Sequence, residues 1–407
     1  MHSSPGGSGL ARCFPYPYKA LLAICSDLDE TPDASVYLET MRYLNTTQRT
    51  GMGQGLGLEV GNSMYFGMPR GQFAYWSADD ADRAMVRGLM RSGHIDCLHS
   101  FGDLVTTRAD AARALDELAR HDCRPQVWID HGTAPSNFGA DIMQGSGDDV
   151  GSPVYHADLT WDFGVRYVWR GRVTSVIGQD RPCSLAGIAQ WRNPAASART
   201  LAKELGKRWL GRFGDIKYEM HATNDVMRPI RLRSGQPVWE FLRSNPHWGG
   251  VSSRETADGL AEVLSEAMLT RLVARRGVCI LYTHLGKVRR PQEPFGPGSR
   301  RALARLARFQ DEGKLLVATT RRVLGYCEAL RAVRIRSDRR AGKTVLEVSS
   351  TSRREDLDGL TIYAPEHGEV AVCINGSVVP DIRRNPPDET GRASVSLPWR
   401  ALEFPAA

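Results

Sequence analysis

Apolar runs alternate with helix-like patterns along the first third of the chain. The predicted strands are short apolar runs, at residues 20–25, 57–68, 94–100 and 124–130. The predicted helices carry apolar residues at helical spacing, at residues 34–45, 80–93 and 108–121. Strands and helices that alternate in this way build βαβ units, so the pattern predicts a largely parallel sheet.

The pattern is less regular over residues 132–250, where a long loop at 132–153 is typical of a functional segment. The further expected elements are strands at 165–171, 277–286 and 314–320, and helices near 195–210, 254–275, 299–312 and up to about Arg331. Ser299 is expected to cap the helix that it precedes. These elements complete a predicted α/β domain over residues 19–333, preceded by an N-terminal arm at 1–18.

Beyond Arg334 the pattern changes to short alternating segments separated by Gly, Pro and Asp. These segments lie at residues 343–350, 360–365, 369–376 and 392–399. Short strands with turn residues between them predict a small all-β module of the sandwich type at residues 334–407.

The composition narrows the class of protein. The chain has 407 residues, of which 42% are hydrophobic and 24% charged, and these proportions exclude disordered and fibrous classes. No apolar run approaches the ~18 residues of a membrane span, and no export signal opens the chain, so we expect a soluble cytoplasmic protein. The eight cysteines form no CxxC pair, so a zinc ribbon is not expected.

Charge is unevenly distributed along the chain. Residues 1–170 carry 14 Lys and Arg against 21 Asp and Glu (−7), residues 171–330 carry 27 against 14 (+13), and residues 331–407 carry 12 against 11 (+1). The basic residues of the middle part are spread over separate helices without interleaved aromatic residues, so we expect no nucleic-acid partner. An anionic or lipid-linked carbohydrate is the expected partner, and the oligomeric state is open.

Polar side chains follow three apolar runs at the points where predicted strands end. Asp27 and Asp29 follow the first strand, His99 and Asp103 follow the third, and His284 closes a late one. In a parallel α/β fold the active site lies at the carboxyl ends of the strands. If the chain turns helically after His99, the side chains of His99 and Asp103 share one face and can reach one ion, and this donor set suits Zn²⁺ or a similar divalent metal.

The run Gly-His-Ile-Asp-Cys-Leu-His-Ser-Phe-Gly-Asp at residues 93–103 resembles the second motif of the polysaccharide deacetylase (NodB homology) superfamily. In that family an aspartate pair closes the first strand and a histidine closes a late strand. Here Asp27 and Asp29 match the first motif, His94 and His99 the second, and His284 the last. Leu28 separates the two aspartates, and Asp103 stands in place of the second metal histidine.

The resemblance implies a distorted parallel (β/α) barrel and a metal-dependent hydrolase. Zn²⁺ is the first expectation, with Mn²⁺, Co²⁺ or Ni²⁺ as alternatives, and the implied ligands are Asp29, His99 and Asp103. Asp27 would act as base and His284 as general acid in the removal of an N-acetyl group from a sugar of a surface polysaccharide or O-antigen pathway. His131 and His94 are candidate substrate contacts.

Two other hypotheses stay open. The run Asp-Leu-Asp-Glu-Thr at residues 27–31 also resembles the haloacid-dehalogenase phosphatases, in which the first aspartate accepts a phosphoryl group. That architecture requires a lysine downstream of the aspartates. The chain has no lysine from residue 20 to residue 202. The second alternative is a non-catalytic glycan-binding protein whose tryptophans stack on sugar rings, with the candidates Trp128, Trp161, Trp169, Trp191 and Trp248.

Overall fold

The computed structural model describes residues 9–27, 31–132, 134–182, 194–246, 256–340 and 342–405. It divides into two compact units. Unit 1 comprises residues 1–21, 310–316 and 322–401, and unit 2 comprises residues 22–309, 317–321 and 402–407. The predicted domain boundaries after residues 18 and 333 stay predictions.

A five-stranded sheet has the order β13-β1-β12-β11-β8, and all of its residues except Leu21 and Leu316 belong to unit 2. Its strands are β13 (Leu316–Val317), β1 (Leu21–Ser26), β12 (Val278–Thr283), β11 (Arg243–Ser244) and β8 (Val173–Thr174). Strand β11 pairs in parallel with both β12 and β8. All residues of β1 and β12 are buried, which explains why both read as continuous apolar runs rather than as alternating ones.

A second sheet of unit 2 has six strands in the order β4-β5-β6-β7-β10-β9. Its strands are β4 (Asn62–Met64), β5 (Ile95–His99), β6 (Val127–Ile129), β7 (Tyr167–Trp169), β10 (Pro237–Phe241) and β9 (Met227–Arg231). The pairs from β4 to β10 are parallel, and only β9 runs antiparallel. A mixed α/β fold with parallel sheets is therefore confirmed.

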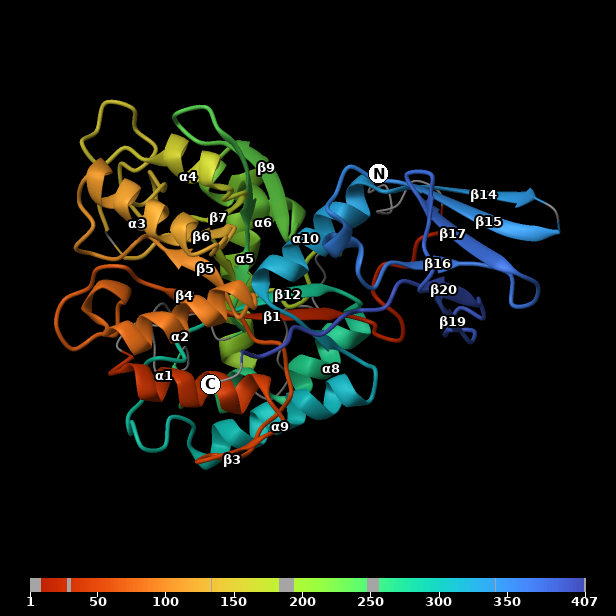
Figure 1. The fold of residues 1–407 in the computed structure, drawn as a ribbon, viewed down its shortest axis with the longest axis horizontal. Coiled ribbons are helices and arrows are strands. Elements are labelled where there is room, and N and C mark those ends of the chain that lie inside the picture. Colours follow the sequence, from red (N-terminus) through yellow and green to blue (C-terminus); the bar gives the residue numbers. More distant parts are fainter. Residues whose placement is uncertain are drawn as a thin grey trace. The chain divides into compact units, whose positions relative to one another are not determined.

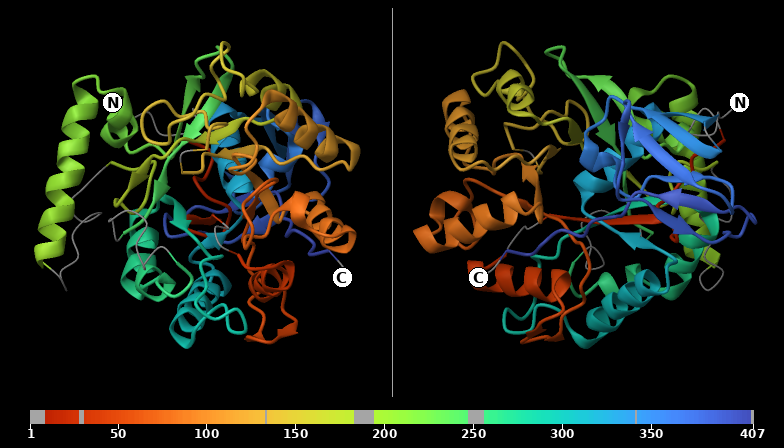
Figure 2. Two further views of the ribbon diagram at one scale, coloured as in Figure 1. Left: turned by 90° about the vertical axis from the view of Figure 1, so that its left-hand side faces the viewer. Right: turned by 45° about the vertical axis from the view of Figure 1, so that its right-hand side comes forward.

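The chain also forms helices, of which α1, α2 and α3 pack on the side of β4 and β5 (Figure 1). They are α1 (Ala34–Asn45), α2 (Asp80–Arg91), α3 (Arg108–Arg120), α4 (Ala157–Phe163), α5 (Pro194–Arg212), α6 (Glu219–Thr223), α7 (Leu260–Val263), α8 (Glu266–Arg275), α9 (Pro297–Asp311) and α10 (Thr320–Ala332). Figure 2 (left) shows α5, in yellow-green, at the edge of unit 2. Side chains that accept from the first turn explain why α1, α2 and α3 begin where the sequence predicts: Asp33, Asp79 and Thr107 cap them.

A closed barrel, which the resemblance implies, is not detected in the described part of the chain. The strands are divided between the two sheets, and the described residues contain no hydrogen-bonded ladder that joins one sheet to the other. Each sheet instead keeps its own strand order.

Unit 1 holds two small sheets and the N-terminal segment. The strands are β14 (Arg334–Arg340), β15 (Lys343–Ser349), β17 (Val370–Ile374) and β18 (Ser377–Val378) in one sheet, and β16 (Thr361–Tyr363), β20 (Ser394–Ser396) and β19 (Arg383–Asn385) in the other. Ala11 bridges Ile362, and the buried Arg12 donates to Asp388. A separate all-β module is not confirmed, because unit 1 also includes residues of α10 and the N-terminal segment.

Three details differ from the sequence-based expectations. Ser299 does not cap α9, which begins at Pro297; its hydroxyl donates to the carbonyl of Ala257 instead. Proline suits the first helical position because its missing N–H would lack a helical partner there. The helix expected over 254–275 is interrupted, since α8 starts anew at its cap Ser265, while residues 254 and 255 lie outside the described part. The hairpin of β9 and β10 was not predicted.

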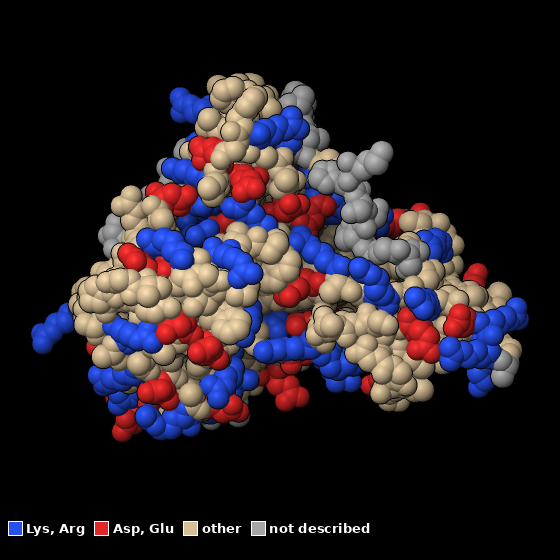
Figure 3. Space-filling model, turned by 90° about the horizontal axis from the view of Figure 1, so that it is seen from above, with Lys and Arg blue, Asp and Glu red and all other residues tan. Residues whose placement is uncertain are grey.

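Basic and acidic side chains lie interspersed on the face drawn in Figure 3. Among the helices that the structure describes, none has both the length and the apolar character that crossing a membrane requires.

His156 is a fully buried histidine in the core of unit 2. Its ring lies 5.0 to 5.3 Å from the rings of Phe101, Trp128 and Phe138, and its nitrogens contact Thr160 Oγ1 and the carbonyl of Ser136. Burial lowers the pKa of His156 to about 4, because the cation would lose its hydration there.

We expect the folded state to lose stability as the pH falls from about 6.5 to about 4, because the unfolded chain then binds a proton at residue 156 that the folded chain excludes. The contribution is about 3 kcal/mol. Urea unfolding across this range should give a weaker pH dependence for His156→Gln than for the wild type, whereas His367→Gln, at an exposed histidine, should follow the wild type. An identical pH dependence for His156→Gln would contradict the assignment.

Candidate active site

Three of the predicted site residues meet where strands of the five- and six-stranded sheets end. Asp27 follows β1, His99 is the last residue of β5, and His284 follows β12. Their exposed fractions are only 1 to 2%. The amide of Asp27 donates to the carbonyl of Thr283 at 2.9 Å, which holds the ends of β1 and β12 side by side. Burial of polar groups at the carboxyl ends of strands is typical of an active site in this fold class.

The carboxylate of Asp27 is paired with a buried arginine that the sequence did not indicate. Both terminal nitrogens of Arg243, the first residue of β11, donate to the two carboxylate oxygens, and one also donates to the carbonyl of Cys25. The guanidinium lies 4.1 Å from the centre of the Trp169 ring and 4.4 Å from that of Tyr282. Aromatic faces on a cation compensate part of the hydration that burial removes.

Two opposing effects act on the pKa of the Arg243 guanidinium. Burial by itself lowers the pKa of the Arg243 guanidinium, but the charge of Asp27 outweighs that effect and the pKa is raised. A two-point contact of this kind also fixes the plane of the carboxylate. Arg243 therefore sets both the charge balance and the orientation of Asp27.

Two imidazoles approach the same carboxylate. His99 Nε2 lies 3.9 Å from Asp27 Oδ1, and His284 Nε2 lies 3.6 Å from Asp27 Oδ2. The ring of Tyr65 stacks on His99 at a centroid distance of 4.5 Å, and the Tyr282 hydroxyl lies 3.5 Å from His284 Nε2. The structure thus brings together an acid, a guanidinium and two imidazoles with little access to water.

A third histidine, His131, extends this cluster. Its ring meets His99 edge to face with 4.7 Å between the centroids. Its Nδ1 lies 2.9 Å from Asp103 Oδ1. Asp103 thereby contacts His131, while its own side chain is 43% exposed.

The loop that carries His131 is held by the buried carboxylate of Asp130. Trp128 Nε1 and the amides of Phe138 and Gly139 donate to this carboxylate at 2.8 to 2.9 Å. Burial raises the pKa of Asp130 to about 7, against the lowering effect of these donors. The run around His131 stands out in the sequence, but the role of Asp130 in positioning His131 does not.

The chain after His99 does not turn as a right-handed helix. Ser100, Phe101 and Gly102 have φ values of 46°, 58° and 96°. For the non-glycine residues this left-handed region is strained, and strain of this kind is concentrated at functional sites. His99 and Asp103 therefore do not share a helical face, contrary to the expectation, although both residues lie beside His131.

Two other predicted residues are not part of the described cluster. His94 precedes β5 and thus lies about 16 Å of extended chain away from His99, at the opposite end of the strand. There its Nδ1 contacts Ser92 Oγ, and its ring meets Phe404. Asp29 lies outside the described residues, so its predicted part in metal binding is untested.

No three His, Cys, Asp or Glu side chains gather as a metal-binding group within the described ranges. The predicted ligand set of Asp29, His99 and Asp103 stays a prediction, since one of its members is not described. The tryptophan-stacking hypothesis loses two of its candidates, because Trp128 and Trp169 are fully buried. Trp191 and Trp248 lie outside the described residues.

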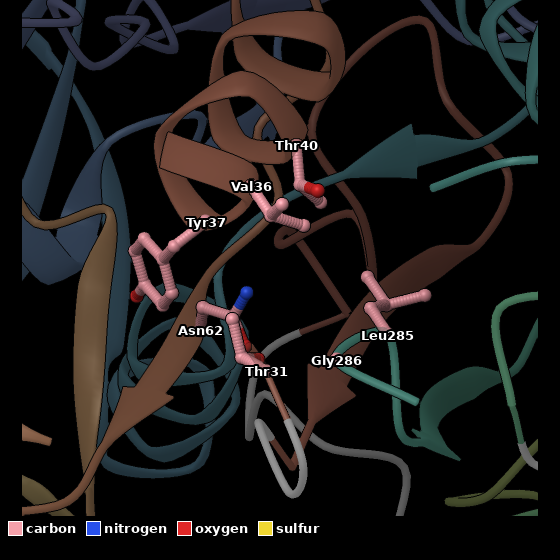
Figure 4. A pocket seen from close by; sticks show the side chains of 7 residues that line it. All are labelled: Thr31, Val36, Tyr37, Thr40, Asn62, Leu285 and Gly286. Carbon is pink, nitrogen blue, oxygen red and sulfur yellow. The ribbon is translucent and has the colours of Figure 1, made fainter. Parts of the chain in front are cut away.

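A small cavity lies beside the strand ends of this site. Side chains from α1, β4 and the segments after β1 and β12 converge on it (Figure 4): they belong to Thr31, Val36, Tyr37, Thr40, Asn62 and Leu285, with Gly286 completing the wall. Its volume is about 10 Å³, which is room for one water molecule at most. Leu285 and Gly286 directly follow His284, so this packing holds the segment that carries the imidazole.

No protein-family model, no curated protein and no solved structure matches the chain. The interpretation of the site therefore depends on its own geometry and chemistry.

Replacing Arg243 by Met should leave the carboxylate of Asp27 buried without its counter-charge. We expect a loss of about 3–5 kcal/mol in the free energy of unfolding, measured in denaturant. The double variant Asp27→Asn/Arg243→Met should recover a large part of the loss, because neither charge then remains. Arg301→Met, at an exposed arginine of α9, is the matched control and should change stability little. Additive losses in the double variant would show that the pair is not coupled.

Proposed function

We propose that this protein is a hydrolase that removes an acyl group, in the first instance N-acetyl, from a carbohydrate. The observation that carries the proposal is the Asp27 carboxylate, buried, held at two points by Arg243 and approached within 4 Å by the imidazoles of His99 and His284. Hydrolysis of an amide needs a proton acceptor for water and a proton donor for the leaving nitrogen, and this cluster contains candidates for both.

In the proposed reaction Asp27 acts as base. Water attacks the carbonyl carbon of the acyl group while its proton passes to the Asp27 carboxylate. The bond between carbon and nitrogen then breaks as His284, in its protonated form, gives a proton to the nitrogen. The products are a free amine on the sugar and the carboxylic acid, acetic acid for an acetyl group.

Arg243 has a positioning role in this proposal. Its two-point contact orients the Asp27 carboxylate, and its pairing with the rings of Trp169 and Tyr282 keeps the guanidinium in place. Tyr65 and Tyr282 flank the two imidazoles and exclude water from one side of each. Such pre-orientation lowers the reorganisation needed during the reaction.

A divalent metal ion fits the donors of this site in part. His99 and His131 are neighbouring imidazoles, and Asp103 contacts Nδ1 of His131, which is the arrangement that orients a metal-binding histidine. We propose that these two histidines hold the ion together with Asp29. When bound, such an ion supplies Lewis-acid polarisation and lowers the pKa of a coordinated water. Asp103 then acts by orienting His131, or as a direct ligand as the resemblance implies.

The finer features of the fold are part of the same proposal. We propose that the two parallel sheets of unit 2 are the halves of a distorted (β/α) barrel and that residues 334–407 function as a β module. The excess of basic residues over 171–330 favours an anionic or lipid-linked carbohydrate as substrate.

Activity can be tested by the release of acetate from a panel of N-acetylated sugars. Asp27→Asn and His284→Ala should each lower kcat by about a hundred-fold or more, because each removes one partner of proton transfer. His367→Ala, at an exposed histidine, is the control and should keep wild-type turnover. Full activity in either site variant would remove the assignment. Release of phosphate from p-nitrophenyl phosphate, lost in Asp27→Asn, would instead support the phosphatase hypothesis.

Metal binding can be tested separately from turnover by titrating Zn²⁺ and Mn²⁺ while following the melting temperature. His99→Ala should abolish the metal-dependent rise in melting temperature, while His284→Ala should keep it. Asp103→Asn should weaken metal affinity by about 10–100-fold if Asp103 acts through His131. A wild-type protein whose melting temperature does not respond to any of these metals would contradict the metal-dependent form of the proposal.

A further inference from the structure

Helix α5 and the short segment that follows it present apolar side chains to solvent. Leu205, Trp209 and Phe213 are spaced four residues apart and are 52%, 60% and 73% exposed, and Leu210 and Ile216 are 37% and 67% exposed. We call these five residues the α5 patch. They make up five of the nine exposed large hydrophobic residues in the described part of the chain. Exposed apolar residues scattered singly are ordinary, but a cluster of this kind marks an interaction site.

The opposite face of α5 is held to unit 2 by polar contacts. Glu204 is buried and accepts from Thr174 Oγ1 and the amide of Ser175. Lys207 donates to the carbonyl of Val173 at 2.9 Å. A surface helix usually turns its apolar face inward, whereas α5 turns polar side chains inward and its apolar stripe outward. Rotation of α5 to bury its apolar stripe would cost these buried polar contacts.

Basic residues outnumber acidic ones in the segment that carries the α5 patch. The segment from residue 194 to residue 218 contains six Lys and Arg residues and two acidic ones. Of the two acids Glu204 is buried and Asp215 is exposed, and both Arg199 and Arg212 are exposed. Within the α5 patch, the ring centroids of Trp209 and Phe213 lie 4.8 Å apart.

We propose that the α5 patch is a docking surface for anionic lipid membranes. Trp, Phe and Leu on one face of a helix flanked by Lys and Arg are the composition of helices that lie in the plane of a membrane interface. The aromatic rings and Leu205 enter the boundary between headgroups and acyl chains. Arg199, Arg212 and Lys217 contact the lipid phosphates.

A contact between two copies of the chain fits the charges less well. A two-fold contact through the α5 patch would bring the same residues of both copies together. Such a contact would gather the exposed cations of both copies, Arg212 among them, in one interface, and like charges in close contact are destabilising. An anionic lipid surface instead attracts these residues, and α5 lies at the edge of unit 2 (Figure 2).

The proposal does not depend on the proposed hydrolase activity. Its test is flotation of the full chain with vesicles of phosphatidylcholine alone, and with vesicles of equal parts phosphatidylcholine and phosphatidylglycerol. We expect binding to the mixed vesicles, weaker binding to phosphatidylcholine, and a decrease with added salt. A wild-type protein that does not bind the mixed vesicles overturns the proposal.

Variants assign the binding to the α5 patch. Trp209→Ala/Phe213→Ala should lower partitioning roughly ten-fold or more, since two interfacial aromatic side chains are lost. Val150→Ala/Val378→Ala is the matched control, because both valines are 67% to 69% exposed and lie elsewhere. Arg212→Gln/Lys217→Gln should lower binding to mixed vesicles by roughly five-fold per cation. Arg336→Gln/Arg339→Gln, at exposed arginines of β14, should not.

Two further measurements keep the outcomes distinct. Trp209→Phe should keep binding but lose the part of the fluorescence blue shift that comes from residue 209 entering the interface. Binding by Trp209→Ala/Phe213→Ala equal to the wild type would contradict the proposal. Sedimentation velocity that shows a dimer of the wild type, abolished in the same double variant, would assign the patch to contact between copies and would equally overturn it.

Discussion

The ion pair between Arg243 and Asp27 is the interaction on which the candidate site depends. Two charges removed from water are costly unless each finds its partner in good geometry, and here the two terminal guanidinium nitrogens meet the two carboxylate oxygens. Trp169 and Tyr282 cover the cation from their ring faces. The pair joins the end of β1 to the start of β11, and so holds together two strands that β12 separates in the sheet.

The same pair explains how the rest of the cluster is arranged. With Asp27 fixed, His284 at the end of β12 and His99 at the end of β5 approach its two oxygens from different strands. Left-handed residues after His99 turn the chain away, and this turn leaves Asp103 beside His131 rather than one helical turn below His99. These local constraints produce a carboxylate that is held by Arg243 and approached by two imidazoles.

Much of the fold follows from local chemistry that the sequence displays. The helices α1, α2 and α3 lie where the apolar periodicity and their capping residues predict them, and the buried strands β1, β5 and β12 match apolar runs. Strands that are stabilised mainly by pairing with strands distant in the sequence were harder to predict. Strands β9 and β10 pair with each other and β10 pairs with β7, but their own residues are polar and apolar in no clear period.

By itself the sequence determined the alternation of strands and helices and the candidates Asp27, His99 and His284, because residues that directly follow apolar runs must lie at strand ends in a parallel sheet. Only the tertiary structure decided that Arg243, 216 positions away, pairs with Asp27. It alone also decided that Asp103 meets His131 and that the apolar stripe of α5 faces solvent. Periodicity records which residues share a face of one element, whereas the pairing of charges and the burial of a face depend on which elements the whole chain brings together.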